Sequence, residues 1–193
     1  MKISGVVLAA GKSSRMGPNK LLLRYRDHSV IEEVLTQISN SDLGEVMVIT
    51  GFENDKVKGV IKKFSDSFRI VYNGKYEMGR AESIKRAVEN VAGDSDALLF
   101  MVGDKPTVKT ELINKAIDEF KRKSQSILYV MTPEGRGHPI IFSKKFFGKL
   151  LGLSGDLVGN ELIEKYKNDV IELADDHIQV DIDTPDDYEG LTE

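Results

Sequence analysis

The sequence predicts an α/β fold in which helices cover both faces of a mostly parallel sheet. Short apolar or β-branched segments alternate with amphipathic segments along the first two thirds of the chain, which is typical of β-α units. The first expected strand, segment 3–9, is apolar throughout instead of alternating, and this indicates burial on both of its faces. The alternation changes beyond residue 125, where two strand-like segments flank a Pro-Gly turn, so we expect a mixed sheet.

Strands and helices are expected to alternate in the first part of the chain. The strands are the segments 3–9, 45–50, 68–73 and 97–103. The first helix begins after Ser29, which forms a capping box with Glu32, and the second is capped by Asn54 and runs to about Phe64. Two further helices are expected at 81–91 and 110–123. Segment 97–103 is the most apolar strand and is expected at the centre of the sheet.

Shorter elements are expected in the second part. Segments 126–132 and 138–143 flank the turn at 133–137, which predicts an antiparallel or edge excursion. The elements expected after it are short helices at 144–151 and 157–167, strands at 170–173 and 178–182, and a helix after Pro185. The sequence contains no linker or repeat, so we expect a single domain over residues 1–193.

The composition excludes several classes of function. The 27 basic and 31 acidic side chains of the 193 residues give a formal charge of −4, which argues against a nucleic-acid partner. The absence of cysteine excludes disulfides, thiolate metal sites and cysteine nucleophiles. The N-terminal apolar run is too short for a signal peptide, and no run approaches the ~20 residues of a membrane span. A cytoplasmic protein with no membrane partner is therefore expected.

The segment GVVLAAGKSSRMGPNKLL at 5–22 contains a Gly-Lys-Ser sequence that suggests a P-loop. It is not a P-loop, because five residues of expected strand separate Gly5 from Gly11 where the motif requires four loop residues. A dinucleotide fingerprint also fails, because it needs three glycines and the loop has Gly11 and Gly17. Neither standard phosphate-binding motif describes this segment.

Phosphate binding is nevertheless expected here from the residue types. Gly11 and Gly17 allow close backbone approach to a ligand. Lys12, Arg15 and Lys20 occur without a carboxylate among them, and an anion between them would relieve their repulsion. The alternative is a solvated surface turn. In an open α/β sheet this loop follows the carboxyl end of a strand, which is where ligands bind.

Six short motifs occur in the order in which a known family carries them. They are LAAGKSSRMGPNKLL, VYNGKYEMGRAESIKRAV, MVGDKPTV, GHPIIF, LSGDLVGNELI and DIDTPDDY. Together they resemble the MobA-like nucleotidyltransferases, which attach a nucleotide to molybdopterin, and most of all the cytidylyltransferases among them. The resemblance covers almost the whole chain. It implies a three-layer α/β/α Rossmann-like nucleotidyltransferase fold with a mostly parallel mixed sheet.

The resemblance implies a set of nucleotide-binding positions. They are Leu8, Ala9, Ala10, Gly11, Lys12, Arg15, Lys20, Asn73, Gly79, Ser83 and Asp104. Asn73, Gly79 and Ser83 are expected beside the base and ribose, although each also suits a turn or a helix start. Ala10 stands where guanylyltransferases usually have glycine, and its methyl group would narrow the slot beside the strand end. CTP is therefore the expected nucleotide, with GTP as the alternative.

Two aspartates are expected to hold Mg²⁺. Asp104 follows the most apolar strand, and Asp183 directly precedes Thr184 and Pro185. Mg²⁺ prefers one or two carboxylates together with phosphate oxygens and waters. The alternatives are that Asp104 forms a turn and that Asp183 or Thr184 caps a helix.

The expected reaction is attack by an acceptor phosphate on the α-phosphorus of a triphosphate, with pyrophosphate as the leaving group. Such a reaction needs positioning and neutralisation of charge more than a protein nucleophile. The positions expected to be catalytic are Arg15, Lys20, Asp104 and Asp183.

The acceptor is the least defined part of the expectation. The resemblance places His138 and Asp156 toward a molybdopterin-type acceptor, while a surface histidine and a helix cap are the alternatives. Lys105 stands where the cytidylyltransferases usually have glutamine, and 80–82 departs from their small residues. A sugar- or alditol-phosphate nucleotidyltransferase and a non-catalytic regulatory nucleotide-binding module are the competing functions. A molybdoenzyme or maturation factor is expected as a transient partner.

Overall fold

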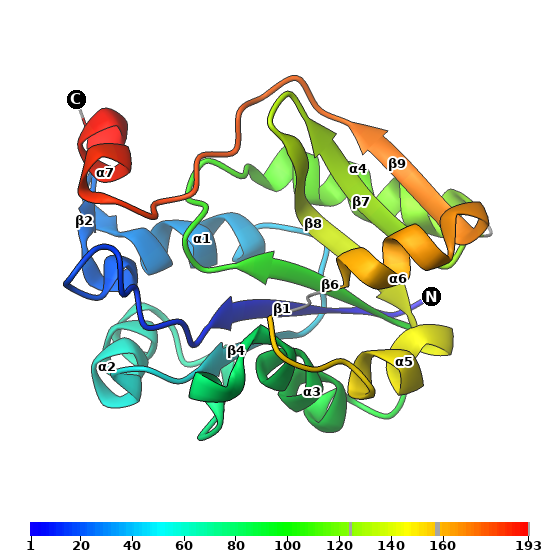
Figure 1. Ribbon diagram of the computed structural model, residues 1–193, viewed down its shortest axis with the longest axis horizontal. Coiled ribbons are helices and arrows are strands. Elements are labelled where there is room, and N and C mark those ends of the chain that lie inside the picture. The colour runs from blue at the N-terminus through cyan, green and yellow to red at the C-terminus, as the bar shows by residue number, and fades with distance from the viewer. Residues whose placement is uncertain (124, 157–158, 193) are drawn as a thin grey trace.

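The computed structural model describes residues 1–123, 125–156 and 159–192, and within these ranges seven strands form one sheet (Figure 1). Their order across the sheet is β5–β4–β1–β6–β8–β7–β9. The strands are β1 (Ile3–Ala9), β4 (Val46–Thr50), β5 (Arg69–Tyr72), β6 (Ala97–Val102), β7 (Ile127–Thr132), β8 (Gly135–Ser143) and β9 (Val170–Ala174). Among these strands β8 alone runs antiparallel to its neighbours, and β6 lies at the centre. The expected mixed sheet and its central strand are confirmed.

Helices cover both faces of this sheet, which confirms the three-layer architecture. One face carries α1 (Val30–Ser39), α2 (Asn54–Phe64) and α4 (Thr110–Arg122), and the other carries α3 (Arg80–Asn90), α5 (Phe147–Leu151) and α6 (Asn160–Lys165). Successive residues of β1 serve the two layers, because Val7 packs with the first group and Val6 with the second. This is why the strand is apolar on both faces except at Ser4, whose buried hydroxyl bonds to Ser95 Oγ. Within the described part of the chain, no helix is both long and apolar enough for a membrane crossing.

A third and smaller core connects the loop after β1 to the C-terminal segment. It contains the buried residues Met16, Tyr25, Val30 and Ile182. The short elements are β2 (Arg24–Tyr25), β3 (His28–Ser29), α7 (Pro185–Thr192) and the 3₁₀ turns η1 (Lys20–Leu22), η2 (Tyr76–Met78), η3 (Lys144–Phe146) and η4 (Lys167–Asp169). In Figure 1 the chain beyond β9 crosses to α7, which lies beside β2 at the other side of the molecule. The C-terminal segment is thereby held over the loop after β1.

Two local expectations are wrong. Asn54 is the first residue of α2 instead of its cap, because its side chain accepts a hydrogen bond from Thr50 Oγ1 at 2.7 Å and Glu53 takes the cap position with φ of 47°. Segment 178–182 is not a strand, since its backbone bonds to side chains: Lys105 Nζ donates to Gln179 O at 3.2 Å and Thr107 Oγ1 accepts from Val180 N at 3.3 Å.

The expected turn at 133–137 is shorter than predicted, because β8 begins at Gly135 and residues 135–137 pair with β7, while the other boundaries agree closely with expectation. The capping box of α1 is confirmed, because the Ser29 backbone N–H donates to Glu32 Oε2 at 2.7 Å. The helix expected at 157–167 is α6 over 160–165, followed by a 3₁₀ turn, and positions 157–158 lie outside the described residues.

Candidate nucleotide and metal site

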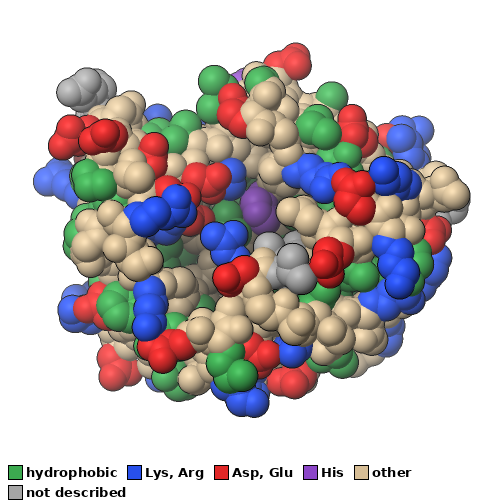
Figure 2. All heavy atoms as spheres, viewed as in Figure 1, with side chains coloured by type: hydrophobic (Ala, Val, Ile, Leu, Met, Phe, Trp, Pro, Cys, Tyr) green, Lys and Arg blue, Asp and Glu red, His purple; other side chains and the backbone are tan. Residues whose placement is uncertain are grey.

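The loop after β1, the turn after β6 and the C-terminal segment meet at one edge of the sheet. Leu8 O accepts a hydrogen bond from Gly103 N at 2.9 Å, and Asp104 O accepts from Ile182 N at 3.4 Å. This edge is the carboxyl end of the central parallel strands, where ligands of α/β sheets bind. Figure 2 shows basic and acidic side chains gathered around a hollow on the viewed face.

Lys20 is the centre of a charged cluster at this edge. Its Nζ lies 2.5 Å from Asp104 Oδ2 and 2.9 Å from Asp183 Oδ1, and its side chain is only 12% exposed. Arg15 Nη2 donates to the second oxygen of Asp183, Oδ2, at 2.7 Å. The structure thus brings together all four positions that the sequence predicts to be catalytic, although Asp183 lies 163 residues beyond Lys20. We call these four residues the Lys20 cluster.

The charges of the Lys20 cluster stabilise one another. Burial, the largest single influence, lowers the pKa of the Lys20 ammonium, but the carboxylates of Asp104 and Asp183 outweigh it and that pKa lies above its ordinary value. Desolvation likewise raises the pKa of the Asp183 carboxyl, while Lys20 and Arg15 together lower it below its ordinary value. Lys20 is therefore cationic and Asp183 anionic near neutral pH.

Hydrogen bonds within the loop after β1 hold the backbone from which the Lys20 side chain extends. Ser13 Oγ accepts from Lys20 N at 3.2 Å, and Asn19 Oδ1 accepts from Leu21 N at 3.2 Å, which closes the turn η1. Met16 anchors the middle of the loop in the third core. The backbone of Lys20 is therefore held by contacts that do not involve its ammonium group.

The start of α7 leaves the Asp183 carboxylate free to face the loop. Asp187 Oδ2 accepts from the backbone N–H groups of Asp183 and Thr184 at 3.0 and 2.7 Å. Thr184 Oγ1 accepts from Asp187 N at 3.3 Å and is the capping side chain. The capping alternative thus applies to Thr184, and the Asp183 carboxylate points to Lys20 and Arg15.

Carboxylates from distant segments neutralise every cation of the loop. Lys12 Nζ lies 2.5 Å from Glu77 Oε1 and 6.0 Å from the centre of the Tyr76 ring, while Arg15 and Lys20 pair within the Lys20 cluster. The repulsion among these cations is therefore relieved by protein carboxylates, and phosphate binding at this loop stays a prediction. The sequence of the loop could not reveal partners contributed by η2 and the C-terminal segment.

The end of β1 is packed tightly against the turn after β4. Ala10 is buried and its carbonyl accepts from Phe52 N at 3.2 Å. A Cβ added to Gly51 would lie 2.7 Å from the Ala10 methyl carbon and 2.8 Å from Ala10 O, so only glycine fits opposite this methyl group. Leu8 and Ala9 end β1, and Gly11 follows in the loop; their contact with a nucleotide stays a prediction.

Asn73, Gly79 and Ser83 lie together at the start of α3. Asn73 Nδ2 donates to Ser83 Oγ at 3.0 Å, Asn73 Oδ1 accepts from Lys75 N at 2.9 Å, and both side chains are buried. Gly79 has a φ of 110° and a Cβ there would collide with the backbone of Gly155. These contacts support the turn-forming alternative, while a role in nucleotide binding stays a prediction.

Asp156 also contacts the start of α3. Its Oδ1 accepts from Arg80 N at 3.2 Å, and Gly155 O accepts from Ala81 N at 3.0 Å. Asp156 therefore bonds to the N-terminus of α3, although the alternative interpretation of the sequence assigns it to the cap of the helix that follows it in sequence. Contact with an acceptor stays a prediction.

A second charged cluster, here called the Lys105 cluster, lies beside the first. Lys105 Nζ donates to Gln179 O at 3.2 Å and lies 2.9 Å from Asp181 Oδ2, and Gln179 exchanges hydrogen bonds with the backbone of His138 at 2.7 and 2.5 Å. His138 Nδ1 lies 3.2 Å from Phe100 O, which assigns its proton to Nδ1, and desolvation lowers the pKa of this imidazole. Gln179 is not among the residues that the sequence predicts for the site. Its only distinguishing feature in the sequence is that it is polar and lies within an otherwise apolar segment.

The carboxylates of Asp104 and Asp183 suit a cation that takes its remaining ligands from phosphate and water. Among the described residues, no group of three or more His, Cys, Asp or Glu side chains converges on one point. Asp104 and Asp183 nevertheless present carboxylate oxygens to a single ammonium. Two carboxylates are what Mg²⁺ takes when phosphates and waters fill its other positions, so these residues fit the ion.

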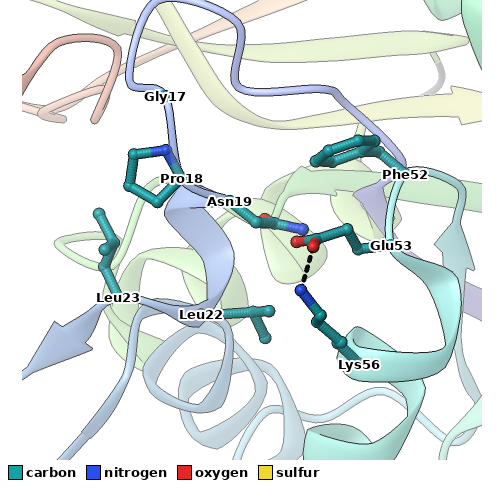
Figure 3. A pocket seen from close by; sticks show the side chains of 8 residues that line it. All are labelled: Gly17, Pro18, Asn19, Leu22, Leu23, Phe52, Glu53 and Lys56. Atoms are coloured by element: carbon teal, nitrogen blue, oxygen red, sulfur yellow. Dashed lines mark hydrogen bonds and ion pairs between the residues drawn. The ribbon is translucent and has the colours of Figure 1, made fainter.

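A cavity of about 340 Å³ lies on the α2 side of the loop (Figure 3). It is lined by Gly17, Pro18, Asn19, Leu22, Leu23, Phe52, Glu53 and Lys56. Asn19 is only 5% exposed, and Figure 3 shows its side chain pointing toward the Glu53 carboxylate, which pairs with Lys56. Because these polar groups face one another, we assign the cavity no ligand.

Residues 5–170 match the family model of the MobA-like NTP transferase domain. The purine catabolism protein PucB of Bacillus subtilis (strain 168) is 28% identical over 196 residues, which cover 96% of this chain and 93% of PucB. The molybdenum cofactor cytidylyltransferase of Escherichia coli (strain K12) is 24% identical over 188 residues, which again cover 96% of this chain and 93% of the relative.

Solved structures agree with this match. The crystal structure of Rv0371c from Mycobacterium tuberculosis H37Rv is 30% identical, covers 100% of this chain and 97% of its own, and superposes with a TM-score of 0.87. A complex of Rv0371c with manganese is 29% identical, covers 100% of this chain and 98% of its own, and has a TM-score of 0.84. The similarity therefore includes the whole sheet and the segments that carry both charged clusters.

Proposed function

We propose that this chain, which belongs to the MobA-like NTP transferase family, is an Mg²⁺-dependent nucleotidyltransferase that moves CMP from CTP to the phosphate of a molybdopterin-type cofactor. The observation that carries the proposal is the Lys20 cluster, with two cations and two carboxylates at the carboxyl edge of the sheet. Phosphoryl chemistry needs such a combination, because anionic oxygens must be neutralised while a metal is held.

In the proposed reaction an oxygen of the acceptor phosphate attacks the α-phosphorus of the triphosphate. A new P–O bond forms while the bond to the bridging α,β-oxygen breaks, and pyrophosphate carries away that electron pair. Lys20 donates to the α-phosphate, and Arg15 offers its planar guanidinium to the β- and γ-phosphates. Asp104 and Asp183 hold the metal, which when bound neutralises phosphate oxygens.

CTP is the nucleotide that the packing around Ala10 favours. Its methyl group fills the space against Gly51, so the strand end offers less room than it would with glycine at position 10. One methyl group is worth about 1–3 kcal/mol of discrimination in a pocket, and this leaves GTP as the second nucleotide to test. The name of the Escherichia coli relative supports the same choice.

The acceptor proposal is supported by His138, whose imidazole feels the charges of Asp104 and Lys105, while Asp156 bonds to the start of α3. Lys105 adds a cation close to His138, which suits an anionic acceptor. A transient contact with a molybdoenzyme or maturation factor would deliver such a product. The competing acceptor class is a sugar or alditol phosphate.

The test is pyrophosphate release from ATP, GTP, CTP and UTP, each with Mg²⁺ and with molybdopterin, a sugar phosphate or no acceptor. We expect release that requires CTP and molybdopterin together. Pyrophosphate release with a sugar phosphate but not with molybdopterin would overturn the proposed acceptor. A preference for GTP over CTP would overturn the proposed nucleotide. Nucleotide binding without pyrophosphate release from any pair would indicate the regulatory module.

A further inference from the structure

We propose that Lys20 occupies the metal position of this site until a triphosphate draws its ammonium away, so that a divalent cation binds with the nucleotide and not before it. This inference rests on the proposed function, in which Asp104 and Asp183 hold the metal. It adds an order of binding that the chemistry of nucleotidyl transfer does not require.

The geometry leaves little for a metal to bind while the nucleotide is absent. The Lys20 ammonium lies between Asp104 Oδ2 at 2.5 Å and Asp183 Oδ1 at 2.9 Å. Arg15 takes the other oxygen of Asp183 at 2.7 Å. A divalent cation that arrives without nucleotide would have to displace the Lys20 ammonium or share the two carboxylates with it. Sharing is unfavourable, because two cations bound to the same carboxylates repel each other strongly in a partly buried site.

A triphosphate removes this obstacle. Its oxygens are strong acceptors for both Arg15 and Lys20, and they supply the further ligands that Mg²⁺ needs. The Lys20 backbone is held by Ser13 Oγ at 3.2 Å, so only the flexible side chain has to turn from the carboxylates to the phosphate. By linkage, the factor by which nucleotide tightens metal binding is also the factor by which metal tightens nucleotide binding.

The decisive experiment is a titration of the full chain with Mn²⁺ and no nucleotide, followed by electron paramagnetic resonance of the free ion. We expect Lys20→Met to bind Mn²⁺ about tenfold or more tightly than wild type, because the competing ammonium is gone. Lys2→Met and Lys123→Met remove the same charge from ion pairs with Asp94 and Glu119, to which no role in the site is given, and we expect them to change the affinity by less than about threefold. Equal or weaker binding by Lys20→Met would overturn the inference.

Two further measurements exclude a folding artefact. For wild type, a non-hydrolysable CTP analogue should tighten Mn²⁺ binding about tenfold or more, and an unchanged affinity would contradict the inference without reference to any variant. The double variant Lys20→Met/Asp104→Asn should lose the gain of Lys20→Met, and a retained gain would place the metal elsewhere.

The outcome is separable from that of the proposed function. If wild type releases pyrophosphate from CTP but Lys20→Met and wild type bind Mn²⁺ with equal affinity, Lys20 does not occupy the metal position, and the assignment as a nucleotidyltransferase stands. If no triphosphate yields pyrophosphate, the enzyme assignment fails whatever the Mn²⁺ titration gives.

Discussion

Lys20 and Lys105 are two largely buried lysines that reach the same C-terminal segment in different ways. Their side chains are 12% and 9% exposed, and they pair with Asp183 and Asp181, which lie two positions apart. Lys20 meets two carboxylates and shares one of them with Arg15. Lys105 contacts one carboxylate and the backbone carbonyl of Gln179. The side chain of Gln179 in turn accepts a hydrogen bond from the backbone of His138.

These surroundings give the two lysines separate tasks. The partners of Lys20 are side chains only, so it can leave them for a phosphate without disturbing the backbone. Lys105 bonds directly to the main chain at Gln179, so it holds segment 178–182 in place where a strand partner is missing. We infer that the Lys20 cluster performs chemistry and that the Lys105 cluster positions the segment carrying Asp183.

The largest effect is expected from Lys20→Met. Loss of a donor to the developing phosphate charge should lower the rate of pyrophosphate release by about 10²–10³-fold. Because the Lys20 backbone is held by η1, the midpoint of thermal unfolding should change by only a few degrees. A rate within about threefold of wild type would assign the charge stabilisation to another residue.

Asp104→Asn should have the next largest effect. An amide is a weaker metal ligand than a carboxylate, so the Mg²⁺ concentration for half-maximal pyrophosphate release should rise about tenfold or more. Asp181→Asn is the matched control, since its carboxylate faces Lys105, and its Mg²⁺ curve should superpose on that of wild type. Coincident curves for Asp104→Asn and wild type would remove Asp104 from the metal site.

A smaller effect, and one of a different kind, is expected from Lys105→Met. Loss of its hydrogen bonds should lower the free energy of unfolding by about 1 kcal/mol, measured in urea, and expose segment 178–182 to protease. Pyrophosphate release should fall only a few fold, through looser placement of Asp183. A loss of rate as large as that of Lys20→Met with unchanged stability would erase the distinction between the two lysines.

The smallest effect concerns the pH dependence of stability. Desolvation lowers the pKa of His138 in the folded chain below its ordinary 6.5, so the unfolded chain binds more protons and stability is lost as the pH falls below 6.5. Each tenfold decrease in the proton affinity of His138 on folding corresponds to about 1.4 kcal/mol. We therefore expect His138→Asn to remove the contribution of this residue to the decrease in the free energy of unfolding between about pH 7.5 and 5.5, measured by urea unfolding.

His177 provides the contrast for that measurement. Its hydrogen bond with Asp175 raises the pKa of this exposed imidazole, so its small contribution is present below 6.5 and is lost as the pH rises through the raised pKa. His177→Gln should leave the loss of stability on acidification in place. An identical pH profile for His138→Asn and wild type would show that the half-buried ring does not oppose protonation.

The sequence predicted those parts of the molecule that depend on local pattern. Val6 and Val7 belong to opposite layers of core, so β1 needs apolar residues on both of its faces, and strands of this kind identified the sheet. Asp104 could be placed at the carboxyl edge because it directly follows the most apolar strand. Motif resemblance supplied Lys20 and Asp183 as its companions.

Contacts between distant segments could not be predicted in this way. Nothing in the loop sequence indicates that Glu77 pairs with Lys12, because that contact depends on how η2 packs. Segment 178–182 has the alternation of a strand, yet Lys105 and Thr107 satisfy its backbone in place of a neighbouring strand. The same limitation concealed the ammonium between Asp104 and Asp183, since each partner belongs to a different element.

A crystal structure with Mn²⁺ and a non-hydrolysable CTP analogue would decide whether the Lys20 cluster is the triphosphate and metal site. We expect the triphosphate against Arg15 and Lys20, and an anomalous manganese peak shared by Asp104 and Asp183, with the Lys20 ammonium moved onto a phosphate oxygen. A triphosphate bound away from the loop after β1, with Lys20 still between the two carboxylates, would contradict this assignment.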